Sequence, residues 1–265
     1  MKANILADKA INTSRLAGWE DGNLTEDYLL GGSIQICQPK DGFRAAIDTV
    51  LMAASVPASR GQHIFEAGSG NGAAAICLGH RVPSSEITGI EIQPNMVTLA
   101  GHNTRLNQLQ KKVKVMIGDI GGPPPPMLRG PFDHAMANPP FLGTNEGRVP
   151  NQTETAIAKT LGTTDLSDWI AGIHFQLKRK GTLTLVWRAD KLHLAIAALM
   201  LEFGDIRALP LWPKPGRPAK RVIVRARKGV RTPMTLLPGL TLHREDGSYT
   251  SACEAVLKGG SSLDF

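Results

Sequence analysis

The sequence predicts an α/β fold, in which a doubly wound, mostly parallel seven-stranded sheet ends in an antiparallel strand and carries small additions at both ends. Between about residues 62 and 203, apolar runs with strand character alternate with helical patterns, which is typical of βαβ units. Two more strand-like runs follow, Ile206–Leu209 and Arg221–Arg227, joined by the proline- and glycine-rich turn Pro213–Pro218. Five alternating units closed by an antiparallel pair give the layout of a nucleotide-type doubly wound sheet.

The elements of the core are predicted from these patterns in chain order. The expected strands are Gln62–Ala67, Ile87–Ile92, Val113–Ile117, Phe132–Ala137 and Thr182–Trp187. The expected helices are Ala73–His80, Pro94 to about Leu106, Leu166–Gln176 and Lys191–Phe203. Pro94 suits the first turn of its helix, because the N–H groups there have no partner within the helix.

Shorter elements flank the core on both sides. A strand at Ser33–Gln38 and a helix at Ala45–Ala54 are expected before it, and a small tail built from Leu240–Arg244 and Ser251–Leu257 after it. The predicted organisation is therefore an N-terminal extension over 1–60, a core over 61–230 and a C-terminal extension over 231–265.

Composition narrows the class of protein. No run approaches the roughly 18 apolar residues of a membrane span, and the first residues lack the apolar stretch of a signal peptide. We therefore expect a cytoplasmic protein with no membrane partner. Cys37, Cys77 and Cys253 have no metal-ligand spacing and form no even disulfide set, so they are predicted to be reduced thiols, and no metal site is predicted.

Positive charge is concentrated in two stretches. The chain has 30 Lys and Arg against 23 Asp and Glu, a net charge of +7. One cluster is Lys178–Lys180, and the other lies between Lys214 and Arg231. Such density favours a polyanionic partner, although a solvated basic face that serves solubility remains an equal alternative.

A glycine-rich segment, Glu66-Ala-Gly68-Ser-Gly70-Asn-Gly72, lies between the first core strand and its helix. Glycines permit a tight turn and close approach to a ligand, and the start of a helix offers unpaired N–H groups. Glu91 ends the next strand, where its carboxylate can bind both hydroxyls of a ribose. These features fit either NAD or S-adenosylmethionine.

Two acidic residues favour S-adenosylmethionine. Glu66 comes just before the glycines, where it can face the cationic amino end of a methionine but would repel a pyrophosphate. Asp119 ends the third strand in Gly118-Asp119, where it can accept a hydrogen bond from the amine of an adenine. The predicted cofactor is therefore S-adenosylmethionine.

The fourth strand ends in Asn138-Pro139-Pro140-Phe141. Two prolines donate no backbone hydrogen bonds and end a strand, so a loop with a core Phe is the simplest interpretation. The alternative is a clamp for a planar amine, whose nitrogen is a poor nucleophile because its lone pair is delocalised. The Asn138 side-chain oxygen and the Pro139 carbonyl can accept from both N–H groups and turn the lone pair toward a methyl donor, while Phe141 stacks on the ring.

The set EAGSGNG, GIEIQP, GD and NPPF resembles the amino-methylating class of Rossmann-type S-adenosylmethionine-dependent methyltransferases. More narrowly, Gln38–Met52 and the tail Leu242–Thr250 resemble the tRNA(Val) adenine-N6-methyltransferase family, which modifies an adenosine beside the anticodon. The resemblance covers about residues 30 to 258. One departure is Phe141, where that family usually has Tyr and where guanine-amine methyltransferases of ribosomal RNA also have Phe.

The resemblance implies an RNA partner, above all tRNA, and several site residues. Asp48 and Thr49 are expected near the methionine end of the cofactor, and Ile92 beside Glu91 in the cofactor site. The candidate phosphate contacts are Lys40, Arg44, Lys214, Arg217, Lys220 and Arg221, although Lys40 and Arg44 can equally be solvated.

Alternatives remain for the acceptor and for the class. The same machinery serves a guanine amine of ribosomal RNA or, as in release-factor methyltransferases, a glutamine amide of a protein. A non-catalytic RNA-binding module on the same fold is a rival of a different class. An NAD-dependent oxidoreductase is another, but it does not explain the Asn-Pro-Pro-Phe motif.

Overall fold

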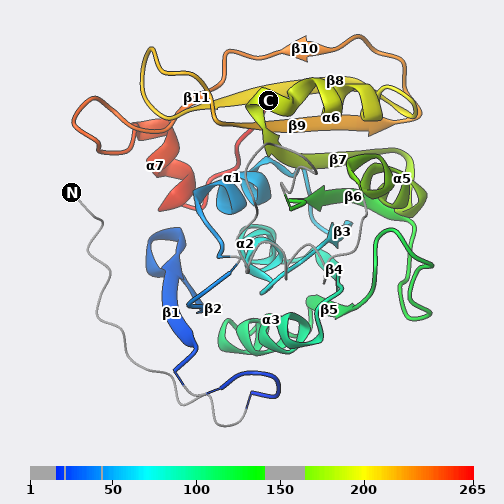
Figure 1. The fold of residues 1–265 in the computed structure, drawn as a ribbon, viewed down its shortest axis with the longest axis vertical. Coiled ribbons are helices and arrows are strands. Elements are labelled where there is room, and N and C mark those ends of the chain that lie inside the picture. The colour runs from blue at the N-terminus through cyan, green and yellow to red at the C-terminus, as the bar shows by residue number, and fades with distance from the viewer. Residues whose placement is uncertain (1–15, 21, 43, 141–164) are drawn as a thin grey trace, which may run out of the picture.

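The computed structural model describes residues 16–20, 22–42, 44–140 and 165–265 (Figure 1). Over these residues the main sheet has nine strands in the order β10-β8-β9-β7-β6-β3-β4-β5, with β11 also paired to β8. The strands are β3 (His63–Ala67), β4 (Glu86–Glu91), β5 (Val113–Ile117), β6 (Phe132–Ala137), β7 (Leu177–Arg188), β8 (Phe203–Trp212), β9 (Arg221–Lys228), β10 (Thr235–Leu236) and β11 (Leu240–Thr241).

The strand directions confirm the predicted doubly wound class. β9 runs antiparallel to both β7 and β8, and the other pairings of the main sheet are parallel. The seven predicted strands are all present, and the short strands β10 and β11 extend the sheet beyond β8.

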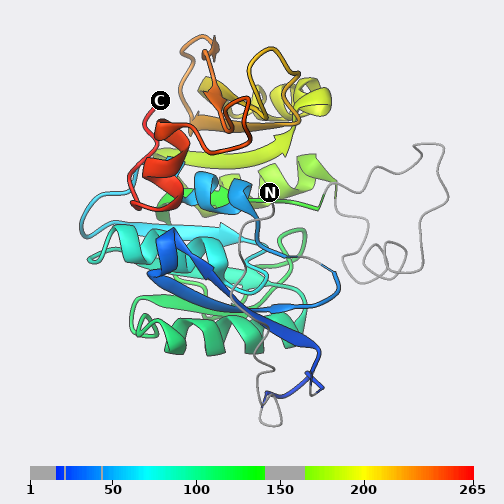
Figure 2. The ribbon, with the colours of Figure 1, turned by 90° about the vertical axis from the view of Figure 1, so that its left-hand side faces the viewer.

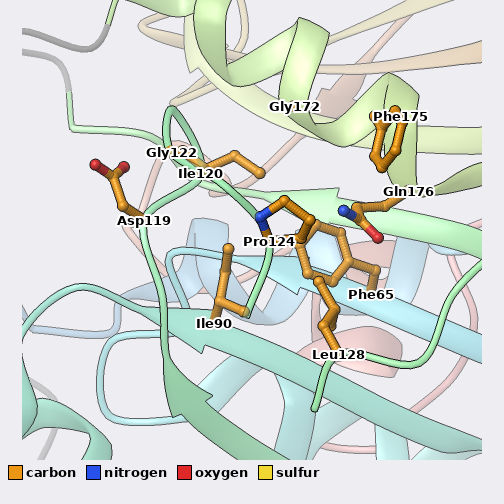
Figure 3. Close-up of a pocket in the computed structure, with 10 residues that line it drawn as sticks. All are labelled: Phe65, Ile90, Asp119, Ile120, Gly122, Pro124, Leu128, Gly172, Phe175 and Gln176. Carbon is orange, nitrogen blue, oxygen red and sulfur yellow. The ribbon is translucent and has the colours of Figure 1, made fainter. Parts of the chain in front are cut away.

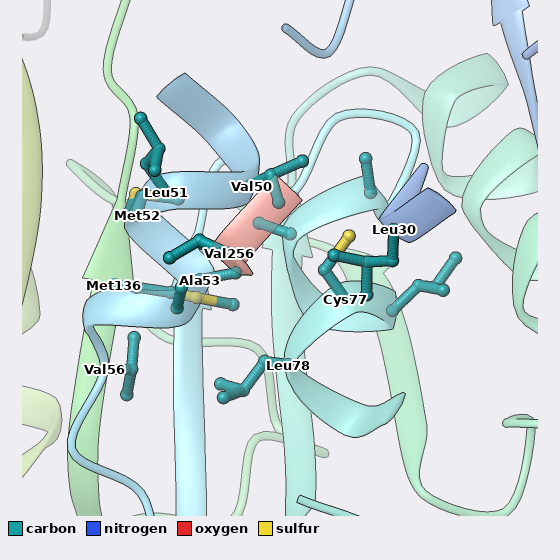
Figure 4. Packing of buried hydrophobic residues seen from close by; sticks show 14 of the residues in the cluster. Leu30, Val50, Leu51, Met52, Ala53, Val56, Cys77, Leu78, Met136 and Val256 are labelled. Carbon is teal, nitrogen blue, oxygen red and sulfur yellow. The ribbon is translucent and has the colours of Figure 1, made fainter. Parts of the chain in front are cut away.

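Helices cover both faces of the sheet. On one face, α1 (Ile47–Ser55), α2 (Ala73–Arg81) and α7 (Ser251–Leu257) share a hydrophobic cluster with the strands (Figure 4). On the other, α5 (Leu166–Gln176) and α6 (Leu192–Leu199) form a second cluster. Because strand side chains alternate, Met136 of β6 enters the first cluster while its neighbours Ala135 and Ala137 enter the second. No helix among the described residues is long and apolar enough to cross a membrane.

Several boundaries differ from the sequence prediction, most of all around α6, β7 and β8. The helix expected over Lys191–Phe203 divides into the short turn η2 (Ala189–Lys191) and α6, and Phe203 already begins β8. β7 begins at Leu177, directly after α5, rather than at Thr182. Periodicity does not separate the end of α6 from the start of β8, because both are apolar. The start of β7 was missed for another reason, since Lys178–Lys180 are charged and exposed and lack a strand pattern.

The N-terminal region contains a hairpin of which only one strand was predicted. β1 (Leu24–Leu29) pairs antiparallel with β2 (Ile34–Pro39), and the turn η1 (Leu30–Gly32) joins them. β1 escaped the sequence analysis because only Leu24 in it is buried. Figure 2 shows this hairpin in blue, lying along the side of the molecule. The domain boundaries at 60/61 and 230/231 stay predictions, and α1, which precedes the first, packs on α2.

Two asparagines fasten the hairpin to the core: Asn103 of α3 (Pro94–Leu106) and Asn107, the residue that follows this helix. Asn103 accepts a hydrogen bond from the Cys37 N–H at 2.8 Å and donates to the Cys37 carbonyl at 3.0 Å and the Asn71 carbonyl at 2.9 Å. One turn later, Asn107 accepts from the Gln35 N–H at 3.0 Å and donates to the Gln35 carbonyl at 2.6 Å. The pitch of a helix, 5.4 Å, is close to the length of two residues along a strand. The two side-chain amides therefore form hydrogen bonds with alternate residues of β2, as the backbone of a neighbouring strand would.

We expect Asn103→Ala to lower the free energy of unfolding by roughly 2–4 kcal/mol, because it leaves the buried Cys37 N–H and Asn71 carbonyl without these partners. Asn107→Ala is the matched control: the site is half-buried, water can replace the amide, and the expected loss is about 1 kcal/mol. Urea denaturation of both variants measures the difference. Equal losses would show that the hairpin does not depend on the buried asparagine.

Candidate active site

The register of the sheet brings the sequence-predicted motifs to one edge. β3 pairs Ala67 with Ala137 of β6, so Gly68 and Asn138 leave the sheet side by side. β3 also pairs Ala67 with Ile90, the residue before Glu91 in β4. β4 in turn pairs Glu91 with the last residue of β5, which Gly118 and Asp119 follow. This is the carboxyl edge of the parallel strands, where folds of this kind bind their ligands.

The glycine loop depends on conformations and spaces that only glycine fits. Gly68, Gly70 and Gly72 have φ angles of 68°, 53° and 81°, in the left-handed region. A Cβ at Gly68 would lie 2.5 Å from the buried ring of Trp169 on α5. The N–H groups of Gly68 and Ser69 both donate to the Ile90 carbonyl, at 2.9 and 3.0 Å, which ties the loop to β4.

Glu91 holds the same loop through its carboxylate. One oxygen accepts from the Gly70 N–H and the other from the Gln93 N–H, both at 2.9 Å, and the side chain is buried. Each carboxylate oxygen has a second lone pair, so ribose hydroxyls can bind to the same group. The sequence predicted the ribose role, but nothing in its pattern pointed to the bond with Gly70.

Glu66 is a buried acid with an unsatisfied oxygen. Its Oε2 has no hydrogen-bond partner among the described residues, and the side chain is 3% exposed. Burial raises the pKa of Glu66 to about 8; the nearby Glu91 adds to this, and hydrogen bonds from Ser69 and Ala75 oppose it. A cationic amino group would supply the missing partner and favour the charged carboxylate. The site therefore fits the amino end of S-adenosylmethionine.

Asn138 presents a second buried oxygen without a partner. Its side-chain Oδ1 is buried and makes no hydrogen bond to the residues that the structure describes. The following Pro139 is buried and Pro140 is half-buried, so the turn is held in place. An unpaired buried amide oxygen costs free energy, which a donor from a substrate amine would recover. Phe141 lies outside the described residues, and its stacking role stays a prediction.

Asp119 lies at one end of a pocket of about 210 Å³, and Phe175 and Gln176 lie at the other (Figure 3). The pocket is lined largely by carbon; its other lining residues are Phe65, Ile90, Ile120, Gly122, Pro124, Leu128 and Gly172. The Asp119 carboxylate is exposed and accepts from the Gly121 N–H at 2.9 Å. Ile92 is half-buried after Glu91. The contacts of Asp119 and Ile92 with an adenine stay predictions.

Asp48 and Thr49 lie in the first turn of α1. Thr49 caps the helix, because its Oγ1 accepts from the Ala46 N–H at 3.4 Å. Asp48 Oδ1 accepts from the Thr49 N–H at 2.9 Å, and Oδ2 lies 3.7 Å from Arg221 Nε on β9. Sequence reasoning missed this ion pair, which joins residues far apart in the chain. The expected place of Asp48 and Thr49 beside a methionine stays a prediction.

Some of the candidate phosphate contacts form hydrogen bonds within the protein, and others are exposed. Arg44 donates to Asp27 at 2.7 Å, to Thr25 Oγ1 at 2.9 Å and to the Pro39 carbonyl at 2.6 Å, so its guanidinium stabilises the hairpin. Lys214 donates to the Glu245 carbonyl at 2.8 Å. By contrast, the remaining lysines and arginine of the set are exposed: Lys40, Arg217 and Lys220.

The edge thus combines a glycine loop, a buried acid whose Oε2 has no partner among the described residues, and a buried amide oxygen, a combination that suits the binding of S-adenosylmethionine. The fold and this site are those of the Rossmann-type S-adenosylmethionine-dependent methyltransferase class. A comparison with family models gives the family: the methyltransferase small domain matches residues 44–209, and the chain belongs to that family.

Individual relatives agree with this class. A tRNA1(Val) (adenine(37)-N6)-methyltransferase of Porphyromonas gingivalis is 27% identical over 222 residues, 78% of this chain and 84% of the relative. A relative of the same name from Vibrio parahaemolyticus is 27% identical over 117 residues, so that alignment spans 44% of this chain and about half, 48%, of the relative. A release factor glutamine methyltransferase of Moorella thermoacetica is 35% identical over 82 residues, 31% of this chain and 28% of the relative.

A solved structure supports the fold. The crystal structure of a predicted O-methyltransferase from Agrobacterium tumefaciens has a TM-score of 0.68 and 23% identity, covering 82% of this chain and 98% of the other. At this identity the likeness concerns the fold.

The Glu66 carboxyl makes the stability of the fold depend on pH. Its pKa is about 8 in the folded chain against 4.5 for an unperturbed carboxyl, so between these values the folded state keeps a proton that the unfolded state has released. The free energy of unfolding therefore falls as the pH rises through this window, by at most about 1.4 kcal/mol per pH unit.

Glu66→Gln removes this titration. We expect urea denaturation at about pH 6 and about pH 7.5 to show a larger loss of stability for the wild-type chain than for the variant, because only the wild type must take up a proton on folding, which becomes harder as the pH rises. The same pH dependence in both proteins would mean that Glu66 is ionised throughout.

Proposed function

We propose that the protein transfers the methyl group of S-adenosylmethionine to an exocyclic amine of a nucleobase in RNA, and specifically to N6 of an adenosine in a tRNA anticodon loop, of the position-37 type. The observation that carries the proposal is the buried side-chain oxygen of Asn138, which has no hydrogen-bond partner among the described residues and belongs to a residue that leaves the sheet beside the glycine loop. A base amine supplies the donor that this oxygen lacks.

In the proposed mechanism the chain orients the amine and performs no acid–base step. The cofactor, when bound, supplies a methyl carbon activated by sulfonium. Asn138 Oδ1 and the Pro139 carbonyl accept from the two N–H groups, which favours pyramidal nitrogen and directs its lone pair toward the glycine loop. Their rigid placement lowers the barrier through orientation. The methylated nitrogen then loses its extra proton to water.

The cofactor residues divide the ligand between them in this proposal. Glu66 faces the amino group, Glu91 accepts from the ribose hydroxyls and Asp119 accepts from the adenine amine. Asp48 and Thr49, at the start of α1, lie toward the methionine end. The buried position of Glu66 and Glu91 supports these roles, because low solvent access strengthens their hydrogen bonds.

The RNA substrate is supported by the names of the relatives and by charge. The relative aligned over 78% of this chain is named for adenine 37 of a tRNA, and the chain carries a net charge of +7. A loop base is cheaper to flip into a site than a paired one, which suits an anticodon-loop adenosine. A tRNA substrate also implies action in the cytoplasm.

A glutamine amide presents the same two N–H groups, and the Moorella relative makes it the second candidate acceptor. Incubation with methyl-labelled cofactor and either bulk tRNA, ribosomal RNA or release-factor protein separates the acceptors. Label in tRNA, and a methylated adenosine missing from the tRNA of a deletion strain by nucleoside mass spectrometry, supports the proposal. Label only in protein or ribosomal RNA contradicts it, and no label with any acceptor favours a non-catalytic RNA-binding module.

Asn138→Ala is expected to lower kcat by at least about 100-fold, because it removes an acceptor from the reacting amine. Cofactor affinity, measured by calorimetry, should stay nearly unchanged. A large loss of cofactor affinity would count against the assigned role.

Glu91→Ala is expected to weaken cofactor binding by roughly 1–3 kcal/mol, because ribose hydroxyls lose their acceptor. Since Glu91 also holds the Gly70 N–H, Glu91→Gln serves as the control that keeps one amide oxygen for the loop or the ribose. Calorimetric titration should rank the affinities wild type, Gln, Ala. Unchanged affinity in the Ala variant would exclude the ribose role.

A further inference from the structure

Opposite charges divide the carboxyl edge of the sheet at β6. On one side, the ends of β3, β4 and β5 carry the acidic groups Glu66, Glu91 and Asp119. On the other side, β7, β9 and β8 bring basic residues to the same edge. Arg188 ends β7 and is paired with Arg221, the first residue of the antiparallel β9. Arg221 is in turn paired with Leu211, next to the end of β8.

We infer that the substrate RNA leaves the Asn138 clamp across the β7-β9-β8 half of this edge, and that Arg217 and Lys220 bind its phosphates. The inference rests on the proposed RNA substrate and adds where the RNA lies. The cofactor occupies the acidic half, which repels phosphate, so the polyanion and the cationic cofactor lie on opposite sides of β6.

The distances suit a strand of RNA that is held close to the flipped base. Neighbouring strands are about 4.8 Å apart, so β7 lies one spacing and β8 three spacings from β6, roughly 5 to 14 Å. The turn between β8 and β9, which carries Arg217 and Lys220, therefore leaves the same edge two to three strand spacings from β6, roughly 10 to 14 Å. Figure 1 shows this turn in yellow beyond the labelled β8 and β9.

The C-terminal segment holds this basic turn in place. The Pro213 carbonyl accepts from the His243 backbone N–H at 3.2 Å, and Lys214 donates to the Glu245 carbonyl at 2.8 Å. Trp212 Nε1 donates to the Pro238 carbonyl at 3.0 Å, which is a third contact with this segment. A turn held at three points presents its two exposed charges, Arg217 and Lys220, with little loss of conformational entropy on binding.

The two arginines paired at this edge, Arg221 and Arg188, already have acidic partners. Arg221 faces Asp48 at 3.7 Å, and Arg188 pairs with Asp190. They give the edge its positive character, but their guanidinium groups also stabilise the fold. Arg217 and Lys220 are therefore the residues whose loss tests phosphate binding with the least structural cost.

The second basic cluster provides a matched control. Lys178–Lys180 lies at the start of β7, whereas Arg188 is its last residue, and at about 3.3 Å per residue these positions are roughly 25 to 30 Å apart. Arg179 and Lys180 are exposed, as Arg217 and Lys220 are. Each pair contains one arginine and one lysine, so the two double variants change the net charge equally.

The experiment compares Arg217→Gln/Lys220→Gln with Arg179→Gln/Lys180→Gln in the full chain. Binding of tRNA from a deletion strain is measured by fluorescence anisotropy across a salt series, with thermal melting as a check on folding. The first variant should weaken tRNA binding on the order of tenfold and reduce the salt slope by about 2, one for each lost phosphate contact. Its cofactor affinity and kcat should stay unchanged while KM for tRNA rises, and the control should behave as wild type.

Equal weakening in both variants would show that net charge alone matters and would overturn the inference. So would greater weakening in the control, which would place the RNA at the opposite edge. If the wild-type chain methylates protein and binds no tRNA, the proposed substrate itself is wrong, which this comparison distinguishes from a misplaced RNA path.

Discussion

The register of β3 with its two neighbours positions every group of the candidate site. Ala67 is paired with Ala137 on one side and with Ile90 on the other, so the glycine loop, Asn138 and Glu91 emerge at one level. A slip of one residue would turn every side chain of a strand to the opposite face. The two hydrophobic clusters prevent such a slip, because each buries alternate residues of the same strands. The packing of the core thus fixes the relative positions of the groups in the candidate site.

Within that frame, the site retains polar groups whose burial opposes folding. Glu66 and Asn138 each keep an oxygen with no partner among the described residues, in a part of the molecule where low solvent access makes this costly. The cost is offset elsewhere, for instance where Asn103 satisfies three backbone groups at the hairpin. Unpaired buried polar groups beside a core whose hydrogen bonds are complete are typical of binding sites, since the ligand supplies the missing hydrogen bonds.

The sequence revealed local order well and distant pairing poorly. Val113–Ile117, Phe132–Ala137 and Leu166–Gln176 have the predicted bounds, because apolar runs or periodic patterns with clear flanks define them. β1 was missed because its side chains are largely polar and half-exposed. The bonds of Glu91 to Gly70 and of Asn103 to Cys37 join residues far apart in the chain, and they depend on how the layers are stacked. Patterns of single elements contain no such information.

The proposed clamp at Asn138 does not by itself distinguish one acceptor from another. An adenine amine, a guanine amine and a glutamine amide each have two N–H groups on a nitrogen whose lone pair is delocalised. Two acceptor oxygens can therefore bind all three in the same way. Discrimination must therefore come from groups that contact the rest of the substrate. A protein segment around a glutamine needs a surface that pairs with peptide groups, whereas RNA brings a phosphate for every nucleotide. A turn held in place by the C-terminal segment, with exposed Arg217 and Lys220 on the same edge of the sheet as Asn138, is suited to the second of these substrates.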